Sequence, residues 1–535
     1  MTHQPKHATI LIVGGLVVDG TGASARRADI ALSGEDIAAV GDLAGLSADV
    51  ILDAAGLVVA PGFIDMHSHS DLALLINGRA ESKIRQGVTT EVIGMCGYSP
   101  APAPENRREK IRKDAGAWGR EVEWTWGSFG EYLEAVRRSG VSVNVVPVVG
   151  HGSIRTGTMG EEGRAPTADE LTAMQREVAR AMEEGAFGMS TGLVYAPGMW
   201  AGTDEVIALA GAMAHADGIY FSHIRSESDK LVEAIEEAAR IGREAGVAVQ
   251  IAHLKAEGRR NWGKTEQALE AIGRARESGV DVSYDCYPYT AWNTGLGQLL
   301  PAWAREGGTE AMLARLTDPE TRAKIRRFIT ENAAEDPGRW ERRLISSVET
   351  EESCGLQGLT VAQVAAQQGR EPEEVVIGLL LAEQGRVGMV GFGMGEDDVR
   401  RVVAHPVGMI GSDASSVAPY GLLGKGHPHP RTYGTFARVL GHYVREENLL
   451  TLEAAVHKMT GQPAAKLGLK DRGLLAPGMA ADICVFDANA IADRATFEKP
   501  QQYAEGVRYV IVNGVVEVEG EEHKNLRAGR VLGRS

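Results

Sequence analysis

The feature that most constrains this chain is a run of eight short apolar segments between residues 61 and 415, separated by amphipathic stretches. The segments are GFIDMHSHS, TTEVIGMCG, VNVVPVVGHG, AFGMSTGL, IYFSHIR, VAVQIAHLK, VDVSYDCYPY and VGMIGSDAS. Stretches between them, such as LVEAIEEAARIGREAG, end in Gly, which commonly follows the last turn of a helix. Eight strand–helix units in one run predict a (β/α)8 barrel of the TIM type, with a doubly wound open sheet as the alternative.

The two ends of the chain have a different sequence pattern, because both are rich in predicted β-strands that are separated by Gly and Asp turns. We therefore expect residues 1–60 and 469–535 to form one small β-sandwich. Strands one to seven of the barrel fall in 61–290, and strand eight with a closing helix in 406–468. The seventh and eighth segments are separated by an unusually long stretch, so 291–405 is predicted to be a mostly helical insertion that forms a lid or a substrate wall.

The composition narrows the class of protein. The 535 residues are 44% hydrophobic and 24% charged, with a net charge of −16. This charge is poorly matched to nucleic acid or to an anionic membrane, and we expect neither as a partner. The sequence shows no signal peptide and no run long enough to cross a bilayer. Its four cysteines are scattered, without a CxxC pair, which favours a cytoplasmic location over a disulfide-rich secreted protein.

Histidines and a cysteine lie where the predicted strands end, which is the reactive edge of such barrels. His67 and His69 close the first segment, and alternate residues of a strand face the same side, so the two imidazoles can share a metal ion. Cys96 closes the second segment, His223 the fifth and His253 the sixth. Each residue alone would be weak support for a metal site, but together they predict one. Imidazole and thiolate donors suit Zn²⁺ better than Mg²⁺ or Ca²⁺.

This constellation resembles the amidohydrolase superfamily and, more narrowly, the D-aminoacylases (N-acyl-D-amino-acid deacylases). The resemblance spans nearly the whole chain, and its motifs are PGFIDMHSHSD, GVTTEVIGMCGYSPAP, GHGSIR, STGLVYAPG, YFSHIR, IAHLKAEG, DCYPY, GSD and HPRTYGTFARVLG. It implies zinc-dependent hydrolysis of the amide bond of a small-molecule N-acyl-D-amino acid to a carboxylate and a free D-amino acid.

The resemblance also implies how the metal ligands divide between two sites. By that likeness Cys96, His223 and His253 hold the tightly bound Zn²⁺. His67 and His69, with Cys96 as a bridge, would form a second site that is weaker or partly occupied.

The remaining site residues are one acid and four substrate contacts. Asp413 ends the eighth segment and is the candidate proton shuttle. By the resemblance, Lys255, Tyr287 and Arg431 hold the substrate carboxylate, and Tyr195 lies beside the scissile carbonyl. Taken from the residues alone, Lys255 could instead form an ion pair at the barrel rim, and Arg431 could lie on the surface.

Three other histidines are not predicted to bind the metal. His427 and His429 form a second HxH, but they follow no strand, so we do not expect them to bind metal. His151 lies at the end of the third segment and could line the pocket or be structural.

One departure from the family concerns the side-chain pocket. Trp292 and Asn293 follow DCYPY, where relatives commonly carry smaller residues, and no Arg or Lys occurs from there to Leu300. Relatives specialised for acidic side chains place an arginine near here. We therefore expect a neutral or hydrophobic side chain, with Trp292 narrowing the pocket.

Two other functions remain open at this stage. One is a cyclic amidase, similar to hydantoinase or dihydroorotase, or a deaminase; the other is a non-catalytic scaffold. The cations Lys255 and Arg431 favour a substrate with a free carboxylate, and a scaffold should have lost ligands that this chain keeps.

Overall fold

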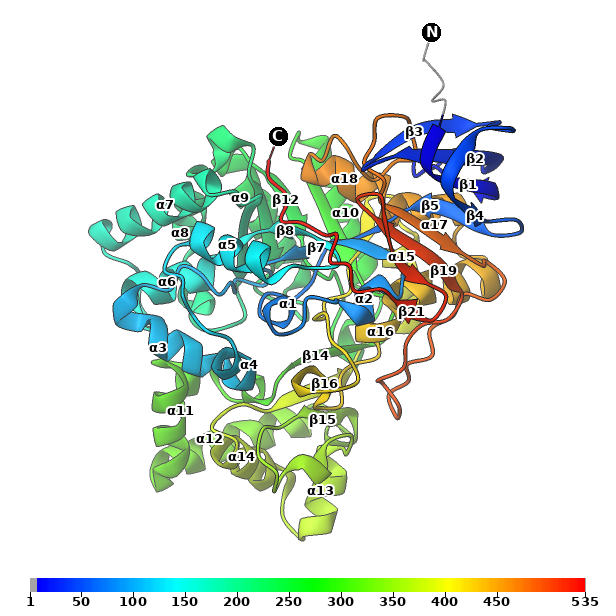
Figure 1. Cartoon of the computed structure of the whole chain (residues 1–535). Coiled ribbons are helices and arrows are strands. Elements are labelled where there is room, and N and C mark those ends of the chain that lie inside the picture. The colour runs from blue at the N-terminus through cyan, green and yellow to red at the C-terminus, as the bar shows by residue number, and fades with distance from the viewer. Residues whose placement is uncertain (1–6, 535) are drawn as a thin grey trace.

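The computed structural model describes residues 7–534 and has a parallel barrel at its centre (Figure 1). Eight strand positions form the barrel, with β8 and β9 sharing the third: β6 (Phe63–Asp65), β7 (Val88–Ile93), β8 (Asn144–Pro147), β9 (Val149–Gly150), β10 (Gly188–Gly192), β11 (Ile219–His223), β12 (Ala248–Ile251), β13 (Val282–Cys286) and β17 (Gly408–Ile410). Neighbouring strands pair in parallel throughout.

The barrel closes where the last strand meets the first. The amide of Met66 donates to the carbonyl of Ile410 at 3.3 Å, and Ser68 and Ala414 form a parallel bridge. Apolar side chains from opposite strands, including Ile64, Val146 and Phe221, pack together in the interior. The (β/α)8 fold predicted from the eight repeated units is thus confirmed, and the open sheet is wrong.

Helices surround the barrel, and α9 ends at a glycine as its sequence predicts. The main ones are α5 (Phe129–Ser139), α7 (Ala168–Glu183), α8 (Thr203–Gly211), α9 (Leu231–Ala245), α10 (Thr265–Glu277), α15 (Glu396–Ala404) and α17 (Leu452–Met459). Thr167 and Glu170 form a capping box that starts α7, and Gly246 ends α9 in the left-handed conformation with φ of 69°.

The two ends of the chain meet in one nine-stranded sheet beside the barrel. Its strands are β1 (His7–Val17), β2 (Arg26–Ser33), β3 (Asp36–Gly41), β4 (Ser47–Asp53), β5 (Val58–Pro61), β18 (Ile483–Phe486), β19 (Val507–Val512), β20 (Val515–Glu519) and β21 (Glu522–His523). β18 pairs antiparallel with β5, which joins the two termini. Beyond the sheet, Gly529 and Val531 bridge back to barrel residues, so the tail leaves the small domain. The domain boundaries drawn from the sequence stay predictions.

The insertion between β13 and β17 forms a separate lobe below the barrel (Figure 1). Its main helices are α11 (Gly308–Thr317), α12 (Pro319–Ala334), α13 (Val361–Gln368) and α14 (Pro372–Ala382). It also contains an antiparallel sheet that the sequence did not predict, formed by β14 (Ala291–Gly295), β16 (Gly388–Phe392) and β15 (Arg343–Ser347). β14 and β15 are far apart in sequence, so their pairing through β16 leaves no local pattern. No helix within residues 7–534 is long and apolar enough to cross a membrane.

A buried cation holds the seam of the barrel. Lys83 Nζ, on α2 (Glu81–Ile84), donates to Asp65 Oδ2 at 2.7 Å, to the Ala414 carbonyl at 2.8 Å and to Ser412 Oγ. Lys83 and Asp65 are both fully buried. Removing one partner of such a pair leaves an uncompensated charge, which is strongly destabilising.

We expect Lys83→Met to lower the free energy of unfolding by about 3–5 kcal/mol, because Asp65 would stay buried without its cation. Chemical denaturation would measure the change. The control is Lys110→Met, since Lys110 pairs with Asp114 and Glu161 at the surface and should change stability by less than about 1 kcal/mol. Equal effects of the two variants would contradict the role given to Lys83.

Candidate metal and substrate site

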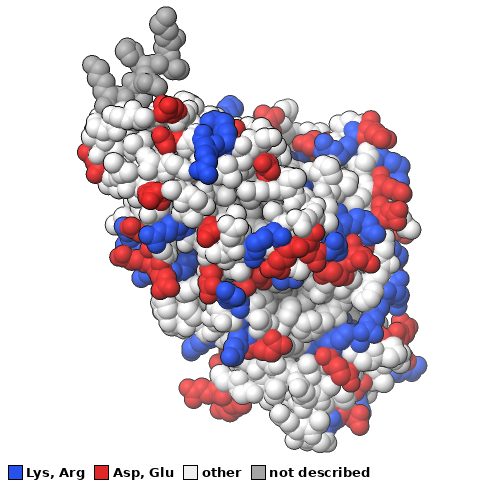
Figure 2. All heavy atoms as spheres, turned by 90° about the vertical axis from the view of Figure 1, so that its right-hand side faces the viewer, with Lys and Arg blue, Asp and Glu red and all other residues white. Residues whose placement is uncertain are grey.

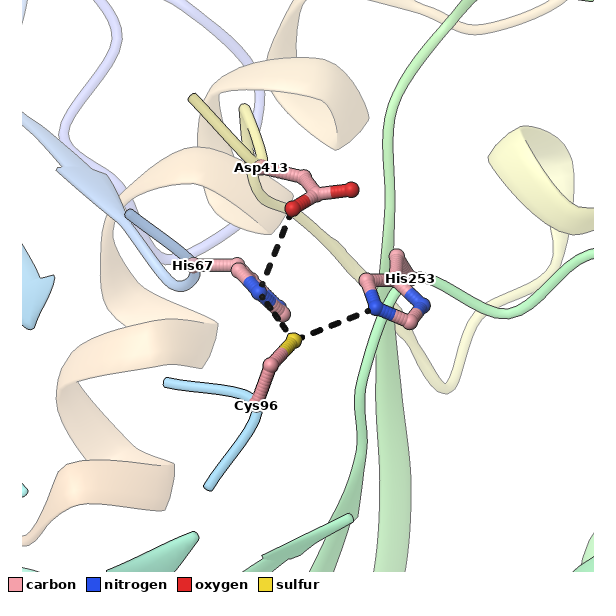
Figure 3. Close-up of side chains that lie close together, drawn as sticks. All are labelled: His67, Cys96, His253 and Asp413. Atoms are coloured by element: carbon pink, nitrogen blue, oxygen red, sulfur yellow. Dashed lines mark hydrogen bonds and ion pairs between the residues drawn. The ribbon is translucent and has the colours of Figure 1, made fainter. Parts of the chain in front are cut away.

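The predicted ligands converge at the carboxyl ends of the barrel strands (Figure 3). Cys96 Sγ lies 3.3 Å from His67 Nε2, 3.6 Å from His223 Nδ1 and 3.4 Å from His253 Nε2. His69 Nε2 lies 3.0 Å from Asp413 Oδ1. The structure therefore brings together all five predicted ligands and the predicted acid.

The backbone turns sharply where three of these side chains enter the site. Cys96, His253 and Asp413 have φ values of 54°, 34° and 51°, in the left-handed region that non-glycine residues seldom adopt. Each follows directly or closely on a strand end, so the turn aims its side chain at the centre of the barrel mouth. Such backbone strain concentrates at functional sites.

The charged groups around Cys96 and Asp413 favour the thiolate of the cysteine and the carboxylate of the aspartate. Burial opposes ionisation of the Cys96 thiol, but His67 and His253 together hold its pKa well below the ordinary value. Burial likewise opposes ionisation of Asp413, yet the Arg431 guanidinium, with Nη1 2.8 Å from Asp413 Oδ2, and the histidines hold the pKa of that carboxyl low. A thiolate and a carboxylate in a ring of imidazoles are ready to bind a cation.

These donors fit a zinc ion. One ligand atom each from His67, Cys96, His253 and Asp413 lie within 4.8 Å of one another, and those of His223, Glu227 and His253 form an overlapping group. Nitrogen and thiolate sulfur form the shell that Zn²⁺ prefers, and three or four protein ligands leave room for a substrate.

The sequence reading missed two carboxylates that contact the ligands. Asp285 Oδ1 lies 3.1 Å from His67 Nδ1 and accepts from the His253 amide at 2.8 Å. Glu227 Oε1 lies 2.8 Å from His253 Nδ1. A carboxylate on the far nitrogen of a ligating histidine fixes the ring and its tautomer. Asp285 could have been found, since it lies in DCYPY at a strand end, but Glu227 follows His223 in a loop without any pattern.

The four predicted substrate contacts line one cavity of about 900 Å³ together with His69, Cys96, His223 and His253. Lys255 Nζ and Arg431 Cζ lie 5.6 Å and 4.6 Å from the centre of the Tyr287 ring, so two cations share one aromatic platform. Lys255 also donates to Glu227 at 2.5 Å, so its ammonium lies in the cavity and not in an exposed rim pair. The Tyr195 ring lies 4.7 Å from that of His223.

The remaining histidines have structural partners. His429 Nε2 lies 3.0 Å from the Ala291 carbonyl, and its Nδ1 accepts from the Arg431 amide at 3.0 Å. His427 Nε2 contacts the Phe497 carbonyl. His151 is buried, with Nε2 3.0 Å from Glu205 Oε1. His427 and His429 lie outside the groups of described residues that could hold a metal, and their hydrogen bonds fix the loop that carries Arg431.

The cavity wall contains cations that the sequence reading did not consider. Arg305, Arg339 and Arg343 line it from the insertion. The expectation of a neutral side-chain pocket rested on the stretch from Trp292 to Leu300 alone. These arginines lie further along the chain, and Arg343, the first residue of β15, reaches the cavity because β15 pairs with β16, which pairs with β14.

Comparison with known proteins decides the family. The sequence pattern of the amidohydrolase family matches residues 50–518. The chain belongs to this family. It is also 39% identical to a D-aminoacylase of Alcaligenes xylosoxydans xylosoxydans over 98% of both chains, which places it among the D-aminoacylases.

Two further relatives are similarly close. An N-acyl-D-glutamate deacylase of the same organism is 38% identical over 98% of this chain and 96% of its own. The crystal structure of an N-acyl-D-glutamate deacylase from Bordetella bronchiseptica, complexed with zinc and a phosphonate inhibitor, is 35% identical with a TM-score of 0.82, covering 98% of this chain and 100% of that one. The amidohydrolase family predicted from strand-end residues is confirmed.

We expect Cys96→Ala to lose bound metal while the barrel stays folded, because Cys96 Sγ is the atom that three imidazoles share. Elemental analysis measures the metal and circular dichroism the fold. Cys354→Ala is the matched control, since Cys354 is exposed and should leave the metal content unchanged. Full metal content in Cys96→Ala would show that its thiolate is not a ligand.

Proposed function

We propose that this amidohydrolase uses Zn²⁺ to hydrolyse the amide bond of N-acyl-D-amino acids. The observation that carries the proposal is the pair of buried cations, Lys255 and Arg431, around Tyr287 and next to the metal-binding group. In an acidic protein, two cations on one side of a metal site fit a substrate with a free carboxylate. The D configuration comes from the related D-aminoacylases.

Cys96, His223 and His253 would hold the more tightly bound zinc ion, and His67 and His69 would complete a weaker second site. Zinc in such a site supplies Lewis acidity, which makes water a competent nucleophile near neutral pH. Asp285 and Glu227 would keep the imidazoles of His67 and His253 in their ligating orientation.

Asp413 would move the proton. Its carboxylate is ionised and lies beside the metal ligands, so it can accept a proton from the attacking water and return it to the leaving amine nitrogen. Tyr195 would stabilise the carbonyl oxygen. Thr294 Oγ1 donates to Tyr195 Oη at 3.2 Å, which leaves the phenol proton free to be donated, and burial raises the pKa of Tyr195 so that this proton is retained.

Arg431, Lys255 and Tyr287 would hold the α-carboxylate. Tyr287 Oη and Arg431 Nε are buried and have no hydrogen-bond partner among residues 7–534. Buried donors without partners are costly, and a bound carboxylate would satisfy them. A hydantoin or a nucleobase lacks that carboxylate, so the hydantoinase and deaminase alternatives are less well matched.

Two further expectations concern the side chain of the substrate and the cellular location of the protein. A neutral or hydrophobic side chain is the expectation from the loop after β13, and it stays a prediction. The cytoplasmic location expected from the scattered cysteines stays a prediction, as does the absence of a nucleic acid or membrane partner.

We expect Asp413→Asn to keep its metal and to lose about 10²–10⁴-fold in kcat, the scale of a lost general base. Metal analysis and steady-state kinetics on N-acetyl-D-methionine would measure both. Asp397→Asn is the control, because Asp397 lies exposed on α15. Turnover near that of the wild type would rule out Asp413 as the proton shuttle.

Arg431→Ala should distinguish an aminoacylase from other amidohydrolases. Removing a buried guanidinium from a bound carboxylate costs about 30-fold to several thousand-fold in kcat/KM. We expect this loss on N-acetyl-D-methionine and a much smaller loss on its carboxamide, in which the carboxylate is already neutral. Arg431→Lys should recover only part of the lost kcat/KM, because an ammonium cannot reproduce the bidentate contact of a guanidinium. Equal losses on acid and amide would mean that Arg431 only shapes its loop.

A further inference from the structure

Asp285, whose carboxylate contacts His67 and His253, is itself held by a buried amide. Gln250 Nε2, on β12, donates to Asp285 Oδ2 at 3.0 Å, and Ser283 Oγ, on β13, donates to Gln250 Oε1 at 2.7 Å. We propose that Gln250 is a positioning residue, which acts through Asp285 to hold the His67 imidazole in the orientation that binds metal. This inference rests on the proposed function, because it concerns the same metal site.

The strand pattern directs the three polar side chains of this network into the barrel. Ala248 and Ala252, two residues before and after Gln250, pack with the apolar cluster of the barrel interior. Side chains alternate along a strand, so Gln250 faces the interior as well. Gln250 and Ser283 are direct partners in the parallel pairing of β12 with β13, so their side chains point the same way. Asp285, two residues after Ser283, lies on the same face and nearer to the predicted metal ligands.

Both carboxylate oxygens of Asp285 are engaged. Oδ1 lies 3.1 Å from His67 Nδ1 and accepts from the His253 amide at 2.8 Å, while Oδ2 accepts from Gln250. Water can solvate the charged side chains of the outer face shown in Figure 2, whereas Asp285 and Gln250 are both fully buried. Removing the Gln250 amide would therefore leave a buried carboxylate oxygen without the donor that the protein provides, which is costly.

The chemistry of these groups fixes the direction of each hydrogen bond in the network. A carboxylate only accepts, so the amide NH2 of Gln250 faces Asp285 and its carbonyl oxygen faces the hydroxyl of Ser283. For the same reason, His67 Nδ1 carries the proton that Asp285 Oδ1 accepts. In the neutral imidazole the lone pair is therefore on Nε2, which lies 3.3 Å from Cys96 Sγ, on the side of the other predicted ligands.

Gly411 limits the space in which Asp285 and His67 meet. A methyl group on Gly411 would lie 2.7 Å from His67 Cβ and 3.1 Å from Asp285 Oδ1. This tight packing restricts both side chains, but the terminal torsion of an aspartate stays soft because its preferences are broad. The hydrogen bond from Gln250 to Oδ2 fixes that torsion, so Oδ1 keeps facing the imidazole of His67.

The test measures the affinity for zinc, by competition with a chromophoric chelator, in addition to activity. Gln250→Met keeps the length of the side chain but removes both of its hydrogen-bonding groups. We expect it to weaken the weaker zinc site, which contains His67, by about tenfold or more, because partners of ligating histidines change metal affinity by about 10–100-fold. The tighter site should change less, since Glu227 Oε1 contacts the His253 ring directly. Ser283→Ala is a milder variant and should weaken the same site by a smaller factor.

A second measurement separates positioning from a general loss of stability. In an Asp285→Asn background, Gln250→Met should cause little further loss of zinc affinity, because its effect passes through Asp285. Gln86→Met is the matched control, since Gln86 is also a fully buried glutamine and bonds to the backbone of Thr432 and Phe436. It should lower the denaturation midpoint by a similar amount and leave both zinc affinities unchanged.

The inference is overturned if Gln250→Met binds its second zinc ion as tightly as the wild type does. It is also overturned if the loss is equally large in the Asp285→Asn background, or if the wild type binds only one zinc ion. Hydrolysis of N-acetyl-D-methionine by the wild type tests the proposed function separately. If the wild type cleaves this substrate while Gln250→Met binds zinc normally, only the inference is wrong. If the wild type binds two zinc ions but cleaves no N-acyl-D-amino acid, the proposed function is wrong, and the zinc affinities still decide the role of Gln250.

Discussion

A buried carboxylate, Asp65, ties the first strand of the barrel to the last. Its Oδ1 accepts from the amides of His67 and Ser412 at 3.1 Å and 2.8 Å, while Lys83 neutralises its charge. This one network fixes the backbone on both sides of the seam. Because His67 and Asp413 adjoin the bonded amides, their positions relative to each other follow from it. The metal-binding group can form only where the barrel closes in this register.

The site then separates charge within a small volume. Cys96 and Asp413 supply negative charge at the centre, and Arg431 and Lys255 supply positive charge on one flank. The pair between Arg431 and Asp413 couples the two regions, so a substrate carboxylate that engages Arg431 would also change the field at the proton shuttle. Under the proposed function, substrate recognition and proton transfer would therefore be linked through the guanidinium of Arg431.

Segments remote from the barrel hold this arrangement in place. The segment between β18 and β19, from the C-terminal part of the small domain, places Phe497 5.0 Å from the His429 ring and 4.7 Å from the Phe392 ring. It thereby packs the insertion against the loop that leads into α16 (Arg431–Arg438). The small domain thus supports the loop that carries Arg431.

The sequence by itself determined the barrel, the joining of both termini and the strand-end ligands, because apolar periodicity and residues such as His67, Cys96 and His253 are local signals. It also placed Asp413 and pointed to a metal-dependent amidohydrolase. Only the tertiary structure decided the contacts of Asp285 and Glu227 with His67 and His253, and the position of Arg343 in the cavity wall. Those residues acquire their roles from neighbours distant in the chain, and the pairing of β14, β16 and β15 that delivers Arg343 leaves no pattern in any single segment.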